Sequence, residues 1–289
     1  MSTRTEQEMF DMIFNFALQD ERVRVVAMNG SRANPNAPRD AFQDFDIVFV
    51  VTEMANFLAD DAWLEYFGRR VIMQKPDTME LFPSDDRSRF GYLMQFEDGN
   101  RIDLTLLPLG ELAHYLKEDS IIRILLDKDG RVPALPESSD KDYWIKRPTL
   151  GMFDDCCNEF WWLSAYVAKG LARGELPYAI AHLDYMRHQL MTMLSWQVGL
   201  QKGFIFSIGK KFKYLQQHIG VEAWQSLCAT WNAGSPEACA KALGSMLALF
   251  REVSKDVAER FGYSYPDYDD KVSRFLGELG MTTLTPGGN

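Results

Sequence analysis

Apolar residues follow two different periods along the first half of the chain. Met9, Ile13 and Phe16 recur at helical spacing, which predicts an amphipathic helix near the start. Short apolar runs follow, and runs of this length and composition are typical of strands. We predict strands at residues 23–28, 44–52, 70–73, 90–96 and 101–107 and near 121–126, with helical pieces near 55–68 and 110–118.

A change of pattern divides the chain. The strand patterns end near residues 131–137, a segment with two prolines that has the composition of a linker. Helices are predicted beyond it at residues 150–172, 178–201, 210–218, 221–230, 235–261 and 268–279. These patterns predict an α+β fold, with a mixed sheet and flanking helices over residues 1–135, an α-helical bundle over 136–280 and a disordered tail over 281–289.

Two carboxylates stand at the start of the predicted strand 44–52. Asp44 and Asp46 are two positions apart, so they project from one face of a strand while their apolar neighbours take the other. Like charges on an apolar strand repel each other and lose hydration, a cost that a bound cation would offset. A predicted hairpin turn, residues 97–100, places Asp103 in the same sheet. The three carboxylates indicate a site for a hard divalent metal ion and the phosphates that it carries.

A short glycine turn precedes the two aspartates. Gly30 and Ser31 follow the predicted strand 23–28, and backbone N–H groups and a hydroxyl at such a turn can hold phosphate oxygens. The segment lacks the Gly-Lys-Ser/Thr ending of a P-loop, which excludes an ordinary P-loop NTPase. Arg32 is the nearest cation, and both a phosphate contact and a solvated surface position are open for it.

Together these residues resemble the motif of the nucleotidyltransferase superfamily that includes DNA polymerase β. In that motif an apolar strand ends in Gly-Ser, two aspartates alternate with apolar residues on the next strand, and a third acidic residue lies on a later strand. Three segments, residues 25–34, 42–46 and 207–215, give a more specific resemblance to the bacterial aminoglycoside 6-adenylyltransferases. This second resemblance extends from Glu6 to about Tyr268.

The resemblance implies a nucleotidyltransferase-type sheet domain, ATP as co-substrate and Mg²⁺ held by Asp44, Asp46 and Asp103. It also implies transfer of AMP to the 6-hydroxyl of the streptidine ring of streptomycin, with release of pyrophosphate and resistance to the antibiotic. Three roles stay open for Asp103: ligand of a second metal ion, general base for the acceptor hydroxyl, or a structural carboxylate paired with Arg101.

A group of lysines opens the predicted helix 210–218. Positive charge at a helix N-terminus opposes the helix dipole unless an anion is bound there. The family resemblance implies that one of Lys210, Lys211 and Lys213 reaches the ATP triphosphate. The pair Lys213-Tyr214 matches the family motif best and Lys210 follows it, while a solvated run of charge is the alternative.

Aromatic rings and carboxylates share faces of the predicted helix 150–172. Asp154 lies on the face of Trp161, and Glu159 lies on the face of Trp162. Such pairs suit a guanidinium-bearing sugar through ion pairs and cation–π contacts, whereas a core position is the alternative for the tryptophans. Asp184, on the next predicted helix, is a further candidate for the same cleft.

Charge and cysteine content narrow the class of protein. The formal net charge of −10 argues against nucleic acid as a partner and suits a cationic substrate. The four cysteines show neither metal-ligand spacing nor a secreted disulfide pattern. With no signal peptide and no apolar run of about 20 residues, we expect a cytoplasmic protein without a membrane partner, as a monomer or a homodimer.

Two other hypotheses compete with adenylylation of streptomycin. The protein could be a nucleotidyltransferase that acts on another small molecule or on a protein. It could also be a catalytically silent nucleotide-binding or antitoxin module. A silent module would be expected to lose one of the acidic positions, and because Asp44, Asp46 and Asp103 are all present, the sequence favours an enzyme.

Overall fold

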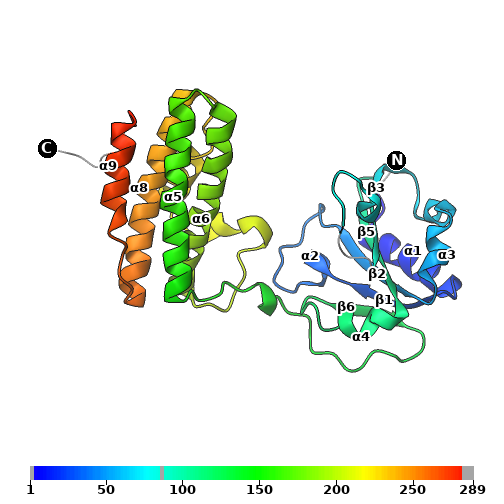
Figure 1. Ribbon diagram of the computed structural model, residues 1–289. Coiled ribbons are helices and arrows are strands. Elements are labelled where there is room, and N and C mark those ends of the chain that lie inside the picture. The colour runs from blue at the N-terminus through cyan, green and yellow to red at the C-terminus, as the bar shows by residue number, and fades with distance from the viewer. Residues whose placement is uncertain (1–2, 85–87, 282–289) are drawn as a thin grey trace. The chain divides into compact units, whose positions relative to one another are not determined.

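The computed structural model describes residues 3–84 and 88–281, which fold as two compact units. The first unit ends at Asp142 and the second begins at Tyr143 (Figure 1). The predicted disordered tail, apart from Met281, lies outside the described residues.

The first unit is built on a mixed sheet with the strand order β3-β4-β5-β2-β1-β6. β2 and β5 run parallel, and the other neighbouring pairs are antiparallel (Figure 1). The strands agree closely with those predicted from the sequence. Their bounds are β1 Val23–Met28, β2 Phe45–Val51, β3 Arg70–Gln74, β4 Phe90–Phe96, β5 Arg101–Pro108 and β6 Arg123–Asp127.

Alternation along β2 assigns the two faces of the sheet. Phe45, Ile47 and Phe49 pack in one apolar cluster, whereas Val48 and Val50 pack in a second cluster on the opposite face. The first face is covered by α1 (Glu6–Gln19) and α3 (Met54–Leu58), and the second by the short α4 (Leu112–Tyr115). The even-numbered positions of β2, Asp46 among them, therefore belong to the face of α4.

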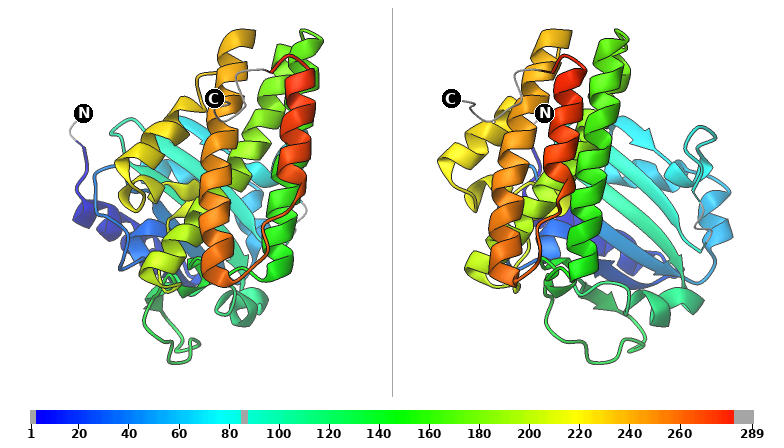
Figure 2. Two further views of the ribbon diagram at one scale, coloured as in Figure 1. Left: turned by 90° about the vertical axis from the view of Figure 1, so that its left-hand side faces the viewer. Right: turned by 60° about the vertical axis from the view of Figure 1, so that its left-hand side comes forward.

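The second unit is a helical bundle. Its long helices α5, α8 and α9 lie side by side in the views of Figure 2, and α6 packs against α5 and α8. At its centre the rings of Phe160 and Phe250 stack with centroids 3.6 Å apart. The helices are α5 Leu150–Ala172, α6 Leu176–Lys202, α7 Val221–Ala229, α8 Pro236–Phe261 and α9 Tyr268–Glu278.

These two units together have the α+β class predicted from the sequence. Local signals explain where the long helices begin: Thr149 and Ser235 accept hydrogen bonds from Met152 N and Ala238 N, as N-cap residues do. In the described part of the chain, no helix is both long and apolar enough to span a membrane.

One predicted helix is absent. Residues 210–218 form two 3-10 turns, Lys210–Phe212 and Leu215–Gln217, in place of a continuous helix. Lys211 and Phe212 have φ angles of 59° and 61°, and this left-handed backbone cannot continue an α-helix. The lysines therefore do not oppose a helix dipole, because no α-helix begins at residue 210.

Candidate active site

The register of two parallel strands brings two of the predicted carboxylates together. β2 and β5 pair so that Asp46 lies directly beside Asp103. Both side chains project from the α4 face, because the alternate residues of each strand pack in the cluster on the other face. Asp44 corrects the sequence prediction in one detail, since it lies just before β2 and not within it.

A glycine allows the close approach of the turn to Asp46. Gly30 opens the single-turn helix α2 (Gly30–Ala33) with φ +66°, a conformation that side chains rarely adopt. A Cβ placed on Gly30 would lie 1.9 Å from Asp46 Oδ2. Any other residue here would have to displace the carboxylate, so the Gly-Ser turn and β2 form one packed unit.

Asn29 was not among the predicted site residues, and it ties this turn to three neighbouring segments. Its backbone N–H donates to Asp46 O at 2.9 Å, and its Nδ2 donates to Ile121 O at 2.8 Å. The Tyr115 hydroxyl donates to Asn29 Oδ1, and burial raises the pKa of that tyrosine well above its ordinary value. The one available signal was an asparagine between an apolar strand and Gly-Ser.

Arg32 is a buried residue that holds a loop. Its side chain is 8% exposed, and its guanidinium donates from Nε to Asp44 O at 3.1 Å and from Nη2 to Gln43 O at 2.9 Å. The third nitrogen pairs with Glu6 at 3.0 Å, and the guanidinium lies over the Phe45 ring. The contacts exclude the solvated surface position, one of the two alternatives for Arg32, and indicate that Arg32 positions the segment that carries Asp44. The phosphate contact stays a prediction.

Arg101 stands among the carboxylates. Its Nε and Nη2 donate to the two oxygens of Asp103 at 2.7 and 2.9 Å, and Nε is also 3.6 Å from Asp44 Oδ2. The hydrogen bond to Asp103 and the charges of Asp44 and Asp46 raise the pKa of Arg101 above its ordinary value. This ion pair is the structural alternative that the sequence left open for Asp103. Within the described residues, no three histidine, cysteine or acidic side chains are grouped as a ready metal site.

Replacing Asp44 by asparagine is expected to raise the melting temperature at neutral pH. Burial raises the pKa of Asp44 above its ordinary value of 3.8, so the folded protein binds this proton more readily than the unfolded chain. The ionised carboxylate therefore destabilises the fold at neutral pH, and the effect vanishes once both states are protonated. Calorimetry of wild type and Asp44→Asn should show a gain that shrinks as the pH falls towards 3.8. A gain that stays constant over that range would assign it to packing.

The lysines predicted to bind phosphate lie on a tight loop of the second unit. Tyr214 N donates to Ile208 O at 2.9 Å, which closes the loop. Lys210, Lys211 and Lys213 are exposed, and within the described residues none of their ammonium groups forms an ion pair within 4.0 Å. Lys213 lies over the Tyr214 ring at 4.9 Å. Positive φ angles at non-glycine residues store strain, which is often found at binding sites.

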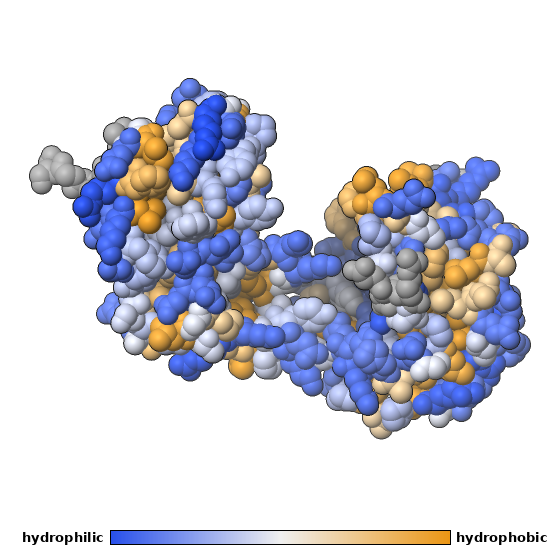
Figure 3. Space-filling view, viewed as in Figure 1, coloured by the Kyte–Doolittle hydropathy of each residue, from blue (hydrophilic) through white to orange (hydrophobic). Residues whose placement is uncertain are grey.

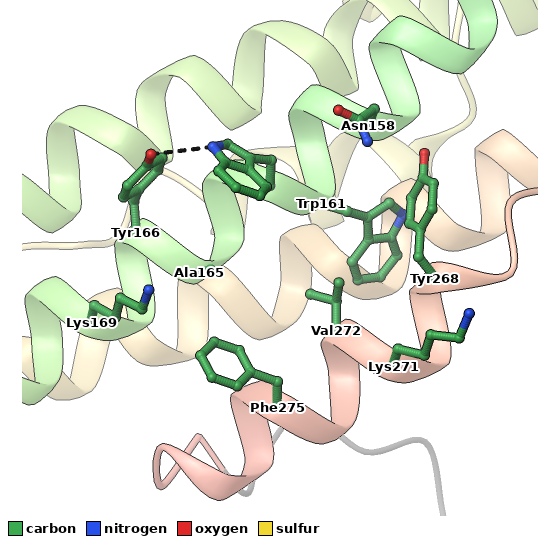
Figure 4. Close-up of a pocket in the computed structure, with 10 residues that line it drawn as sticks. Asn158, Trp161, Ala165, Tyr166, Lys169, Tyr268, Lys271, Val272 and Phe275 are labelled. Carbon is green, nitrogen blue, oxygen red and sulfur yellow. Dashed lines mark hydrogen bonds between the residues drawn. The ribbon is translucent and has the colours of Figure 1, made fainter.

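The two adjacent tryptophans of α5 have different environments. Trp161 is buried, with 1% of its surface exposed, whereas Trp162 is 62% exposed and donates to the Tyr166 hydroxyl at 3.2 Å. Both rings line a hollow of about 470 Å³ between α5 and α9 (Figure 4). Figure 3 shows apolar surface over these two helices with polar residues at its border. The charged residues that line the hollow are Lys169 and Lys271.

The carboxylates predicted to accompany these rings lie elsewhere on the helices. Asp154 and Glu159 are exposed on α5 but do not line the hollow. Asp184, on α6, forms an ion pair with Arg187, which is itself buried and hydrogen-bonded to Thr230. The hollow therefore presents positive charge, and the pairing of aromatic rings with carboxylates predicted from the sequence does not occur there.

A mixed sheet that presents carboxylates from neighbouring strands beside a Gly-Ser turn defines the protein as a nucleotidyltransferase. Residues 3–279 match the family model for streptomycin adenylyltransferase, and the chain belongs to that family. Aminoglycoside 6-adenylyltransferases of Bacillus subtilis and Campylobacter jejuni are 46% and 47% identical to it over 94% of this chain, covering 96% and 95% of those relatives. A crystal structure of an aminoglycoside 6-adenyltransferase from Bacillus subtilis, 42% identical, aligns over 96% of this chain and 99% of its own, with a TM-score of 0.48.

Proposed function

We propose that the protein transfers AMP from ATP to the 6-hydroxyl of the streptidine ring of streptomycin, releases pyrophosphate and so confers resistance. Membership of the streptomycin adenylyltransferase family supports the reaction and the substrate class. The observation that carries the proposal is the register of β2 and β5, which sets Asp46 beside Asp103 and next to the Gly-Ser turn.

The three carboxylates are proposed to hold Mg²⁺, and their chemistry fits that ion. Carboxylate oxygens are the hard ligands that Mg²⁺ prefers, and two or three of them are sufficient because the ion keeps waters and phosphate oxygens. Asp46 and Asp103 are register neighbours, and Asp44 is close enough to share a guanidinium nitrogen with Asp103. When bound, the metal ion supplies positive charge to the triphosphate.

The remaining steps are assigned to residues that bind, orient or accept a proton. The backbone of Gly30 and the hydroxyl of Ser31 are proposed to orient phosphate oxygens at the turn. Lys210 and Lys213, with Tyr214 beside them, are proposed to neutralise the triphosphate, because their ammonium groups lack ion-pair partners within the described residues. Asp103 would take the proton from the acceptor hydroxyl as the hydroxyl attacks the α-phosphorus atom.

For streptomycin we propose contacts to carboxylates and one exposed ring. Asp154 and Glu159 are exposed, and Asp184 keeps an exposed side chain despite its ion pair, so each can meet a guanidinium group. Trp162 presents an open ring face for a cation, whereas the burial of Trp161 assigns it to the wall of the bundle. Trp162 also lines the hollow, whose two lysines disfavour a cationic sugar, so the proposed contact is limited to the solvent-exposed part of this ring.

Mass spectrometry of an aminoglycoside panel, incubated with the protein, ATP and Mg²⁺, tests this proposal. We expect a gain of one AMP on streptomycin and none on aminoglycosides that lack a streptidine ring. Fragmentation should place the AMP on streptidine, and Asp154→Asn, Glu159→Gln or Asp184→Asn should raise KM for streptomycin in at least one case. Transfer of AMP to a protein or to an unrelated aminoglycoside would contradict the assignment.

A further inference from the structure

Arg101 forms an ion pair with a carboxylate of its own strand. It lies two residues before Asp103 on β5, and both side chains project from one face of the strand. Its guanidinium holds both Asp103 oxygens, and its Nε is shared with Asp44. The Arg101 guanidinium is therefore a positive charge placed among three carboxylates.

Arg4 and Arg24 also form bidentate pairs, and theirs join distant parts of the chain, whereas Arg22 pairs with Asp20 two positions away. Arg4 pairs with Asp98, 94 positions away, and Arg24 pairs with Asp129, 105 positions away. Such pairs hold segments together. Arg101 and Asp103 already belong to one strand, so their pairing joins no segments. Outside its own strand, the Arg101 guanidinium lies near Asp44, which is one of the three carboxylates.

The charge of Arg101 cannot be removed by a change of pH. A guanidinium stays protonated in proteins, so the carboxylates always have this cation beside them. A metal ion on the same carboxylates would repel it, because unit charges a few ångströms apart interact strongly even near a protein surface. The side chain is 38% exposed, which leaves it a path to solvent.

We propose that the Arg101 guanidinium acts as a built-in counter-ion. It neutralises part of the charge of the three carboxylates when no metal is bound, and it must be displaced before a divalent ion can bind. This inference rests on the proposed function of the three carboxylates. Its consequence is that the protein binds free Mg²⁺ weakly and binds it tightly only together with the negative charge of a nucleotide. Arg101 therefore couples metal binding to ATP binding.

The test uses Arg101→Gln, with Arg24→Gln as a control that breaks another bidentate arginine pair, one that joins distant segments away from the carboxylates. Titration calorimetry with MgCl₂ and no nucleotide should show at least a roughly tenfold higher Mg²⁺ affinity for Arg101→Gln than for wild type. In EDTA this variant should melt at a lower temperature than wild type, and Mg²⁺ should restore the loss. Arg24→Gln should lose stability equally with and without Mg²⁺, and Arg101→Lys should keep the weak affinity of wild type.

Unchanged Mg²⁺ affinity in Arg101→Gln would overturn the proposal. A variant that folds only in Mg²⁺ would support it, and one that is unfolded with and without Mg²⁺ would overturn it, because Arg101 would then be a structural residue. Adding Asp46→Asn to Arg101→Gln should abolish the gained affinity. The Mg²⁺ affinities and melting temperatures are measured without an acceptor, so they are independent of the transfer assay. If wild type transfers AMP but wild type and Arg101→Gln bind Mg²⁺ equally well, only the role of Arg101 fails. If wild type neither transfers AMP nor binds Mg²⁺ with ATP, the proposed function fails.

Discussion

Asp46→Asn is expected to lower kcat/KM for AMP transfer by at least about 10³-fold, because a metal ion contributes several kcal/mol of charge stabilisation that this change removes. Asparagine has nearly the same shape, so the close approach of Gly30 to this side chain is preserved. The fold should therefore remain intact, and the melting temperature should stay equal or rise as repulsion among the carboxylates falls.

Pyrophosphate release at saturating Mg²⁺, together with calorimetric melting, measures both parts of this expectation. Asp60→Asn is a matched control, because Asp60 is a carboxylate on an exposed turn of the same unit, where it accepts a hydrogen bond from Ala62 N at 2.9 Å. That control should keep its activity within about twofold. Retention of most of the wild-type rate by Asp46→Asn would refute the metal assignment, and an unfolded variant would instead make Asp46 a structural residue.

Asp103→Asn is expected to lower kcat by about 10²- to 10⁴-fold while ATP affinity stays within a few-fold of wild type. The reason is that a general base acts only once the acceptor hydroxyl is bound, and that two carboxylates, Asp44 and Asp46, are sufficient to hold the metal ion with ATP in this variant. Loss of that base should also flatten the acidic limb of the pH–rate profile. Single-turnover kinetics over a pH series, with ATP binding measured separately by calorimetry, would provide both readings.

Two other outcomes would reassign Asp103. A collapse of ATP–Mg²⁺ affinity together with activity would make it chiefly a metal ligand. No change in either would leave the ion pair with Arg101 as its whole role, which the observed distances of 2.7 and 2.9 Å make a real alternative. Arg101→Gln separates these cases, because it frees Asp103 without removing the carboxylate.

The sequence predicted the sheet well because period-two alternation reports burial directly. Asp46 and Asp103 were assigned to strands on this basis, and both lie in strands of the structure. That they are register neighbours could not be read from the sequence, since pairing depends on contacts between segments far apart in the chain. Asp44 lies just outside its strand because the Arg32 guanidinium holds the loop by Asp44 O.

The predictions for Arg32 and for the two tryptophans of α5 were incomplete for one physical reason. Local sequence does not reveal which face of an element its neighbours will cover. For Arg32, which follows a glycine turn, the sequence left a phosphate contact and a surface position open, and the structure shows Glu6 and Phe45 enclosing it. Helical spacing separates Trp161 from Trp162, yet α9, about a hundred positions later, forms the other wall of their hollow.

The helix predicted over residues 210–218 is absent for a different reason. Residues 210–218 contain helix-forming side chains, and propensity favours a helix there. Gly209 packs so closely against Lys213 and Tyr214 that a Cβ on it would lie 2.7 Å from either side chain. This contact and the positive φ angles belong to a compact loop, which no local pattern in the sequence indicated.

The parallel pairing of β2 with β5 also limits where the chain can change its length. A single residue inserted in β5 before Asp103 would turn that carboxylate to the face covered by α1, since side chains alternate along a strand. The turn at residues 97–100 is free of this constraint because it precedes the paired positions. A change of length at the hairpin tip therefore leaves the register of Asp103 unchanged, although it would disturb the pair of Asp98 with Arg4, whereas inside β5 a single insertion or deletion would remove the proposed base from its site.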